Sequence, residues 1–129
     1  MANIVIADDD EEILEYLRTG LESTGHSVYS TLRGKEALQL IKDRTPDIII
    51  LDVMMPDVDG YSLVIELSDD ADTKNIPVLI TTALSPTKTL FDRYPQVVGF
   101  FMKPLDINIL NKTINTVLAK KNNSKNKKG

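Results

Sequence analysis

The most hydrophobic run of the chain, Ile48-Ile49-Ile50-Leu51, stops at an acidic residue, Asp52. A continuous apolar run of this length is typical of a strand that is buried on both faces of a parallel sheet. The stretch that follows it, Met55-Pro56-Asp57-Val58-Asp59-Gly60, is rich in turn-forming residues and predicts a loop. We therefore expect a central strand whose carboxyl end carries an acid and opens into a loop.

Further strand-like segments lie along the chain, and amphipathic helical patterns alternate with them. Together with the central run, the expected strands span residues 4–7, 27–31, 48–51, 77–81 and 99–102. The expected helices span residues 10–24, 35–44 and 61–68, a short stretch from Ser85-Pro86 to Pro95, and a last helix capped by Asp106. Five such strand–helix units predict a doubly wound α/β sandwich, with a five-stranded parallel sheet between two helical layers.

The polarity of the strands indicates their order in the sheet. Residues 4–7 and 48–51 are almost purely aliphatic and should be central, whereas residues 27–31 are more polar and should lie nearer an edge. This pattern fits the strand order 2-1-3-4-5 of flavodoxin-like folds. In such sheets ligands bind beyond the carboxyl ends of the strands, so we look for functional residues there.

The composition excludes several classes of site. The chain has 129 residues, which predicts one domain. Cysteine is absent, which excludes disulfides, zinc–thiolate sites and thiol nucleophiles, and a single histidine excludes a multi-histidine metal site. That histidine, His26, follows Gly25 at a turn, and we expect it at the surface. No apolar run approaches the roughly 18 residues of a membrane span, and the N-terminus lacks the basic region of a signal peptide, so we expect a cytoplasmic protein.

Charge is distributed unevenly along the chain, although the net charge is only −4. All 19 acidic residues lie at or before Asp106, whereas the last eleven residues contain five lysines and no acid. An acidic body argues against nucleic-acid binding, because phosphate contacts need clustered basic side chains. Residues 120–129 are polar and lack apolar periodicity, so we expect residues 1–119 to form the domain and residues 120–129 a disordered Lys/Asn-rich tail.

Polar side chains follow or end four of the five expected strands. Asp8 and Asp9 follow the first strand, Asp52 the third, Thr82 the fourth and Lys103 the fifth. Because the carboxyl ends of parallel strands share one edge of a sheet, these side chains should form one site. Three carboxylates repel one another without a cation, and oxygen ligands with retained waters suit Mg²⁺. A carboxylate beside Mg²⁺ can accept a phosphoryl group, whose oxygens the lysine and the hydroxyl would bind.

The sequence resembles the receiver domains of two-component response regulators, the CheY-like family. The matching segments, in order within residues 3–118, are residues 4–10 (IVIADDD), 47–60 (DIIILDVMMPDVDG), 77–83 (PVLITTA) and Lys103-Pro104. The resemblance implies a receiver domain over residues 1–119 that acts as a phosphorylation-dependent signalling switch in a phosphorelay, and not as an enzyme. It implies a histidine kinase or a histidine phosphotransfer protein as phosphoryl donor and a protein as downstream partner, with no role for nucleic acid or membrane.

The resemblance also implies a role for each acidic residue of the site. Asp52 matches the phospho-acceptor, Asp9 the direct Mg²⁺ ligand and Asp8 the acid that acts on the metal through water. The backbone carbonyl of Met54 would complete the protein's share of the metal ligands. In this family the side chains of Met54 and Leu84 would flank the path of the hydrolytic water, and because both are apolar we expect slow self-dephosphorylation.

A second set of residues is implied to transmit the signal. Thr82 matches the switch hydroxyl, and Lys103 matches the lysine that pairs with the phosphoryl group. Pro104 follows it, and we expect the peptide bond between them to be cis. Phe100 stands where the family has a rotating aromatic residue. Phosphorylation would change the face built by the fourth helix, the fifth strand and the last helix.

Two alternatives from other functional classes stay open at this point. Asp8-Asp9-Asp10 can be interpreted as the motif of a small haloacid dehalogenase-like phosphohydrolase, with Asp8 as nucleophile. That interpretation leaves Asp52 without a role, and no Gly-Thr pair follows Asp10. The second alternative is a receiver-fold binding module that signals without phosphate, against which the intact set of acids argues.

Overall fold

The computed structural model of the chain describes residues 2–83 and 91–128, with side chains as far as Lys121. The elements, in chain order, are β1 (Asn3–Ala7), α1 (Glu11–Glu22), β2 (Ser27–Thr31), α2 (Gly34–Arg44), β3 (Ile48–Asp52), α3 (Gly60–Asp69), β4 (Val78–Thr82), β5 (Val97–Met102) and α4 (Ile107–Lys128). All five expected strands are present, and the observed bounds differ from the expected ones by no more than two residues.

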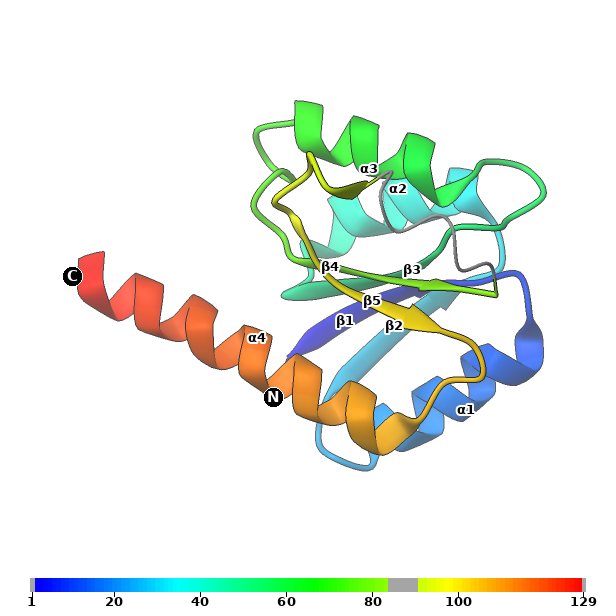
Figure 1. Cartoon of the computed structure of the whole chain (residues 1–129), viewed down its shortest axis with the longest axis horizontal. Helices are drawn as coiled ribbons and strands as arrows, with labels where there is room; N and C mark the ends of the chain where they lie inside the picture. Colours follow the sequence, from blue (N-terminus) through cyan, green and yellow to red (C-terminus); the bar gives the residue numbers. More distant parts are fainter. Residues whose placement is uncertain (1, 84–90, 129) are drawn as a thin grey trace.

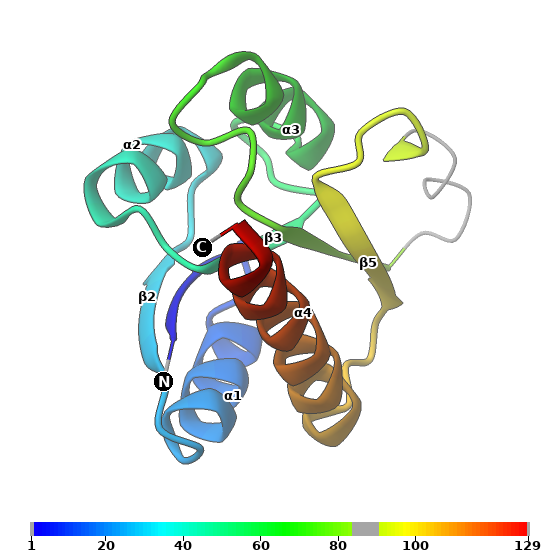
Figure 2. The same cartoon turned by 90° about the vertical axis from the view of Figure 1, so that its left-hand side faces the viewer.

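The five strands form a parallel sheet in the order β2-β1-β3-β4-β5, which confirms the predicted fold class and strand order. The more polar strand β2 lies at one edge, as its composition predicts. Helices α2 and α3 cover one face of the sheet, and α1 and α4 cover the other (Figures 1 and 2). The result is a three-layer α/β sandwich with the loops after the strands gathered at one edge of the sheet.

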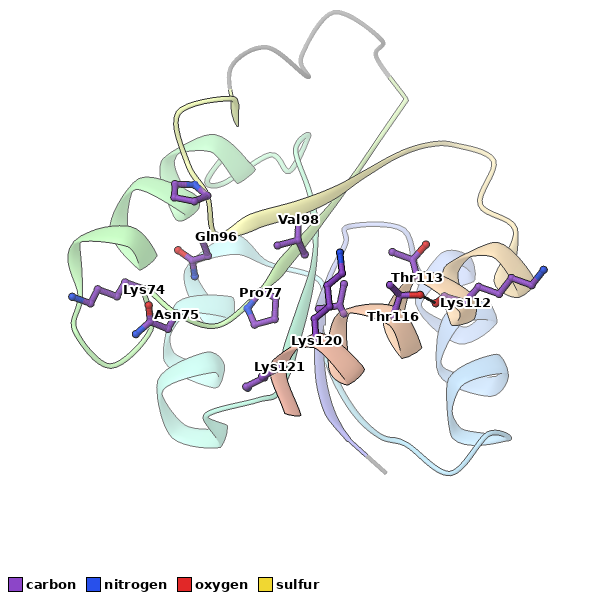
Figure 3. Close-up of a pocket in the computed structure, with 12 residues that line it drawn as sticks. Lys74, Asn75, Pro77, Gln96, Val98, Lys112, Thr113, Thr116, Lys120 and Lys121 are labelled. Atoms are coloured by element: carbon purple, nitrogen blue, oxygen red, sulfur yellow. Dashed lines mark hydrogen bonds between the residues drawn. The ribbon is translucent and has the colours of Figure 1, made fainter. Parts of the chain in front are cut away.

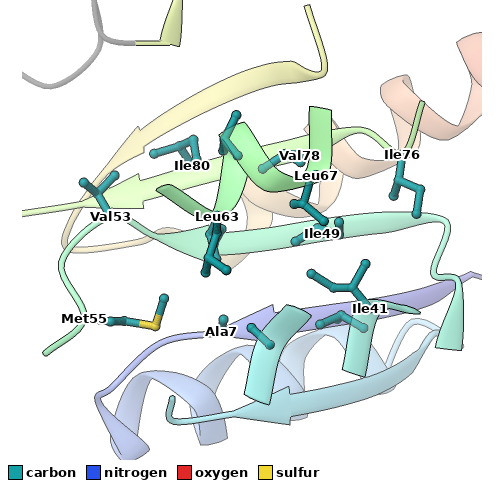
Figure 4. Close-up of a cluster of buried hydrophobic side chains, with 14 of the residues drawn as sticks. Ala7, Ile41, Ile49, Val53, Met55, Leu63, Leu67, Ile76, Val78 and Ile80 are labelled. Atoms are coloured by element: carbon teal, nitrogen blue, oxygen red, sulfur yellow. The ribbon is translucent and has the colours of Figure 1, made fainter. Parts of the chain in front are cut away.

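One hydrophobic cluster joins the sheet to α2 and α3. Ile41 of α2 and Leu63 and Leu67 of α3 are almost completely buried. They pack over the β3 residue Ile49 and the β4 residue Ile80, as Figure 4 shows. Burying one such side chain contributes about 2 kcal/mol, so this layer holds β3 and β4 firmly in the centre of the molecule.

A second cluster joins the opposite face of the sheet to α1 and α4. Leu14, Leu17 and Leu21 of α1 recur every three or four residues and are buried together, as the helical periodicity predicts. Leu110 and Ile114 of α4 are buried in the same cluster. Because both helical layers are anchored by apolar stripes, the carboxyl ends of the strands are held in a fixed arrangement.

His26 is buried, with 8% of its surface exposed, so the prediction of a surface residue is wrong. Its Nδ1 atom accepts a hydrogen bond from the backbone N–H of Ala2 at 3.1 Å. The backbone N–H of Ser27 donates to the carbonyl of Ala2 at 2.9 Å, so His26 lies where the first two strands begin to pair. Burial, together with the nearby N-terminal charge, lowers the pKa of the His26 imidazole.

The end of the chain also differs from its prediction. The backbone of α4 continues to Lys128, where the sequence suggests a disordered tail from residue 120. Residues 107–128 contain neither glycine nor proline, and Lys121 lies 3.8 Å from the carboxylate of Asp47, which supports the extension. The domain boundary at residue 119 stays a prediction.

Two other expectations concern the remainder of the chain. The short helix expected from Ser85-Pro86 falls largely on residues 84–90, which lie outside the described residues. Within residues 2–83 and 91–128, no helix has both the length and the hydropathy needed to cross a membrane.

Candidate functional site at the carboxyl edge of the sheet

The polar residues at the strand ends meet at one edge of the sheet, as expected. Asp8 directly follows β1, Asp52 ends β3, Thr82 ends β4 and Lys103 directly follows β5. These four strands are consecutive neighbours in the sheet, so their carboxyl ends lie side by side. The parallel topology thus brings together residues that are up to 95 positions apart in the sequence.

Lys103 lies between two buried carboxylates. Its Nζ atom donates a hydrogen bond to Asp52 Oδ2 at 3.1 Å and forms an ion pair with Asp8 Oδ2 at 3.0 Å. The side chains of Asp8 and Asp52 are 1% and 2% exposed, and that of Lys103 is 18% exposed. Carboxylates so deeply buried require a cation beside them, and Lys103 supplies one positive charge for the two.

Backbone hydrogen bonds orient both carboxylates. The N–H of Met54 donates to Asp52 Oδ1 at 3.0 Å, and the N–H of Asp10 donates to Asp8 Oδ1 at 2.9 Å. Each acid therefore has one oxygen held by the main chain and directs the other toward Lys103. The loops after β1 and β3 thus fix the positions of the acids, independently of any ligand.

Asp9 completes a cluster that fits a divalent cation. Asp8, Asp9 and Asp52 each offer one carboxylate oxygen, and these oxygens lie within 4.8 Å of one another. Asp9 is exposed, whereas Asp8 and Asp52 are buried, so the cluster is open on one side. Apart from its ion pair with Lys103, Asp8 Oδ2 accepts no hydrogen bond within the described part of the chain. Three carboxylates against one lysine leave two negative charges, and the all-oxygen donor set suits a hard cation such as Mg²⁺.

The pKa values at the site follow from burial and from the charged neighbours. Burial raises the pKa of the Asp8 carboxyl and the Asp52 charge adds to the rise, while the N–H of Asp10 and the Lys103 ammonium oppose it. Burial alone would lower the pKa of Lys103, but its contacts with Asp8 and Asp52 outweigh this effect and raise it. Lys103 is therefore protonated at neutral pH, and a further cation would favour ionisation of Asp8.

Thr82 and Phe100 lie on the strands next to the acids. Thr82 is completely buried, and its carbonyl accepts a hydrogen bond from the backbone N–H of Lys103 at 2.8 Å. Phe100 is partly buried beside Ile80 of β4 and packs against the ring of Phe91 with the centroids 6.5 Å apart. The peptide bond between Lys103 and Pro104 is cis, as predicted. Thr82 on β4 and Phe100 on β5 thus connect the carboxylate site to the packed rings of Phe91 and Phe100.

The loop after β3 and the first residue of α3 provide two residues, Asp57 and Gly60, that the sequence did not assign to the site. A Cβ atom on Gly60 would lie 2.7 Å from the carbonyl oxygen of Asp52, so only glycine allows the loop to close on the acceptor strand. Asp57 accepts hydrogen bonds from the backbone N–H groups of Lys35, Gly34 and Val58, which lower its pKa. Asp57 therefore caps α2 from the loop. In the sequence, the turn-forming composition of residues 55–60 is the feature that could have indicated the roles of Asp57 and Gly60.

Met54 and Leu84 are the two residues expected to flank the path of the hydrolytic water. The side chain of Met54 is half exposed, although its backbone N–H contacts Asp52. Leu84 lies outside the described residues.

Comparisons with known proteins agree with this arrangement. Residues 4–115 match the response regulator receiver domain family. The chain is 35% identical over 120 residues to protein PilH of Pseudomonas aeruginosa, and the match covers 92% of this chain and 99% of that protein. Other relatives are longer: the match to the probable transcriptional regulator ycf27 of Guillardia theta, 40% identical over 81 residues, covers 63% of this chain and 31% of that protein.

A solved structure shows the same architecture. The fold superposes on chemotaxis protein CheY4 of Vibrio cholerae with a TM-score of 0.83 and 29% sequence identity, covering 91% of this chain and 98% of the other. With the sheet order, the clustered acids and the family match in agreement, the chain belongs to the receiver domains of two-component response regulators.

Proposed function

We propose that Asp52 is the phosphoryl acceptor of this receiver domain. The observation that carries the proposal is the position of Asp52 Oδ2, 3.1 Å from Lys103 Nζ at the end of the central strand. An ammonium group at this distance can neutralise the oxygens of a phosphoryl group bound to the carboxylate. Asp8 is equally buried and has equivalent partners in the Asp10 N–H and Lys103, so the choice of Asp52 as acceptor follows the match of this chain to the receiver family, and Asp8 is assigned to the metal.

In the proposed reaction one Asp52 carboxylate oxygen attacks the phosphorus of a phosphohistidine on a kinase or phosphotransfer protein. The new bond is P–O and the broken bond is P–N, and the leaving imidazole nitrogen keeps the electron pair and then takes a proton. Lys103 stays protonated and stabilises the charge on the transferred oxygens. Later hydrolysis by water releases inorganic phosphate and restores the carboxylate, which makes the domain a reversible switch.

The proposal includes a divalent cation at the acidic cluster. Asp9 and Asp52 would bind Mg²⁺ directly, Asp8 would act through water, and the carbonyl of Met54 would complete the protein ligands. When bound, Mg²⁺ supplies positive charge that Lys103 alone does not provide for three carboxylates and a phosphoryl group. The open side of the cluster at Asp9 leaves room for retained waters and for the donor.

Signal output is proposed to pass through Thr82 and Phe100. Thr82 ends β4, which pairs with the strand that Asp52 ends, and its carbonyl accepts a hydrogen bond from the Lys103 N–H, so a shift of Thr82 toward a phosphoryl group would reach both strands. Movement of Thr82 would change the space beside β5, where Phe100 packs. The face built by β5, α4 and the segment before β5 would then present a new surface to a protein partner in the cytoplasm.

Phosphoryl labelling tests the assignment of Asp52. We would incubate the purified chain with acetyl phosphate, with Mg²⁺ or with EDTA, and measure phosphoprotein by intact mass. We expect labelling of the parent with Mg²⁺, none in Asp52→Asn, and labelling at least about tenfold slower in Asp9→Ala. Asp72→Asn removes an exposed acid outside the site and should label as the parent does.

The same experiment separates the alternatives. Loss of phosphate turnover in Asp8→Asn with normal turnover in Asp52→Asn would support a phosphohydrolase with Asp8 as nucleophile. An unlabelled parent, folded by circular dichroism and saturated with Mg²⁺, would support a binding module that signals without phosphate. Either result would overturn the assignment of Asp52.

A further inference from the structure

The first turn of α2 is capped from a distant part of the chain. Its N-cap residue, Arg33, makes no side-chain hydrogen bond to the helix, whereas α1 and α3 are each capped by the residue directly before them. Asp57, in the loop between β3 and α3, accepts instead the backbone N–H of Gly34 at 2.9 Å and that of Lys35 at 3.1 Å. The loop therefore satisfies N–H groups that α2 leaves open.

The loop and the helix also fit closely at this contact. A Cβ atom on Gly34 would lie 2.8 Å from the carbonyl oxygen of Val58 and 2.9 Å from its Cβ, so only glycine lets the loop approach so closely. Both carboxylate oxygens of Asp57 are occupied, Oδ1 by the N–H groups of Gly34 and Val58 and Oδ2 by that of Lys35. The positive end of the helix dipole adds to the attraction, so the middle of the loop is held against α2.

The same loop begins at the acidic site. Met54, three positions before Asp57, donates its N–H to the Asp52 carboxylate at 3.0 Å, and its carbonyl is the metal ligand proposed above. Gly60 closes the loop by donating its N–H to the carbonyl of Val53 at 2.9 Å. Hydrogen bonds thus tie the two ends of the loop together beside Asp52, and those of Asp57 tie the segment between them to α2.

Asp8 is connected to the same helical turn by a separate route. Its backbone N–H donates to the carbonyl of Thr31, the last residue of β2, at 3.2 Å. The Thr31 hydroxyl donates to Glu36 Oε2 at 3.0 Å and accepts the N–H of Arg33 at 3.2 Å. The first turn of α2 is therefore bonded to the segments that carry two of the three clustered acids, and it can fix their spacing.

We propose that Asp57 is a positioning residue for the divalent cation. By binding the N-terminus of α2, Asp57 holds the loop so that the Met54 carbonyl and the Asp52 carboxylate can bind the metal together. Asp57 is exposed and lies outside the clustered acids, so it acts through the loop and not as a ligand. Without this contact, metal binding would have to order the loop, and the entropic cost would weaken the affinity. The inference rests on the Mg²⁺ site of the proposed function.

A titration with Mg²⁺ tests this role. We would follow the backbone amides of the unphosphorylated full chain and fit Kd from the shifts at Asp9 and Met54. Asp57→Ala should raise Kd about fivefold, the factor that corresponds to the loss of a helix cap. Labelling of this variant by acetyl phosphate should return to the parental rate at saturating Mg²⁺, because Asp52 and Lys103 are unchanged. A rate that stays low at saturation would contradict a role confined to metal binding.

Matched variants separate positioning from simple charge. Asp57→Asn removes the charge but keeps an oxygen that can accept one N–H, so Kd should rise only about twofold. Gly34→Ala removes no charge but would push the helix away from Val58, and it should raise Kd about as much as Asp57→Ala. The control is Asp106→Ala, which removes the hydrogen bond that the Asn108 N–H donates at the start of α4 and should leave Kd within about 1.5-fold of the parent.

Hydrogen exchange gives a second readout that needs no phosphorylation. Because coupling between two sites is reciprocal, exchange of the Gly34 and Lys35 amides should slow on addition of Mg²⁺ in the parent, and not in Asp57→Ala. The reference is the amide of Lys74, which donates to the Asp70 carbonyl at 2.9 Å. Lys74 lines a groove beside α4, shown in Figure 3, and precedes β4, so it lies away from the acids that follow the strands. Its exchange should not respond to Mg²⁺.

Two outcomes would overturn the positioning role alone. The first is an equal Mg²⁺ affinity of Asp57→Ala and the parent. The second is equal weakening by Asp57→Ala and Asp57→Asn with parental affinity in Gly34→Ala, which would indicate that the charge of Asp57 merely attracts the cation. A parent whose Asp9 and Met54 amides do not shift with Mg²⁺ is a different result, because it would overturn the proposed metal site itself and the inference with it.

Discussion

Lys103 is the cation that two buried carboxylates share, and its removal is the most direct test of the electrostatics at the site. Lys103→Met leaves Asp8 and Asp52 buried without this positive charge, so we expect unfolding in urea to show a loss of about 3 kcal/mol at neutral pH. Added Mg²⁺ should restore part of the loss. Lys35→Met, at an exposed site, should stay within about 0.5 kcal/mol of the parent. An equal stability of the Lys103 variant and the parent would contradict the argument.

The side chain of Met54 is expected to control the lifetime of the phosphoryl group. It lies two positions after Asp52 and is half exposed, and it cannot orient a water by a hydrogen bond. Met54→Asn introduces a polar group and should speed phosphate loss about tenfold, measured after donor removal with Mg²⁺ present. Leu84→Glu should act in the same direction. Ile109→Asn, another exposed apolar residue, is the control, and an unchanged rate in Met54→Asn would refute this role.

His26 should make stability depend on pH. Its pKa is lowered in the folded chain, so below the ordinary value of about 6.5 the unfolded chain binds more protons. The contribution of neutral His26 is therefore present above that pH and is lost as the pH falls toward the folded pKa. His26→Gln keeps an acceptor for the Ala2 N–H but does not titrate. We expect a shallower decline of stability for this variant between about pH 7 and pH 5, and identical profiles would contradict the prediction.

At the scale of elements, the loop from β3 to α3 depends on glycine at its end. Gly60→Ala would place a methyl group 2.7 Å from the Asp52 carbonyl oxygen and 2.8 Å from Val53 Cα, and main-chain atoms cannot move away cheaply. We expect a loss of about 2 kcal/mol in unfolding free energy and slower phosphoryl labelling, because the acceptor strand must shift.

Gly99→Ala is the matched control for that substitution. Its added methyl group would meet the tip of the Leu79 side chain at 2.7 Å, which can rotate away. The loss should be smaller and labelling should be unchanged. If Gly60→Ala labels at the parental rate, the close contact at Asp52 does not matter for the reaction.

At the scale of the whole molecule, phosphorylation should change a surface distant from the acceptor. We expect beryllofluoride with Mg²⁺, a mimic of the phosphoryl group, to shift backbone amides around Asp52 and also those of residues 91–103. The path is physical, since Thr82 ends the strand beside Asp52, binds the Lys103 backbone and neighbours β5. Asp52→Asn should abolish all shifts, and Thr82→Ala should retain those at Asp52 and reduce those at Phe100. Shifts confined to the neighbourhood of Asp52 would contradict this mechanism.

The sequence by itself determined the strands, their order and the location of the acids. Continuous aliphatic runs such as residues 48–51 are stable only when buried on both faces, which makes them recognisable as central strands without any knowledge of their neighbours. Parallel topology then places the residues that follow the strands at one edge, which is why Asp8, Asp52 and Lys103 could be assigned to one site. The residue types along each strand, together with the rule that parallel strands share one carboxyl edge, were sufficient for this assignment.

Only the tertiary structure decided the features that depend on contacts between distant segments. His26 is buried because Ala2, 24 positions earlier, donates to its ring, and Asp57 caps a helix that begins 23 positions before it. Hydrophobic periodicity is a property of neighbours in the chain, whereas hydrogen-bond partners and surface charge patterns arise only when the folded backbone brings separate segments together.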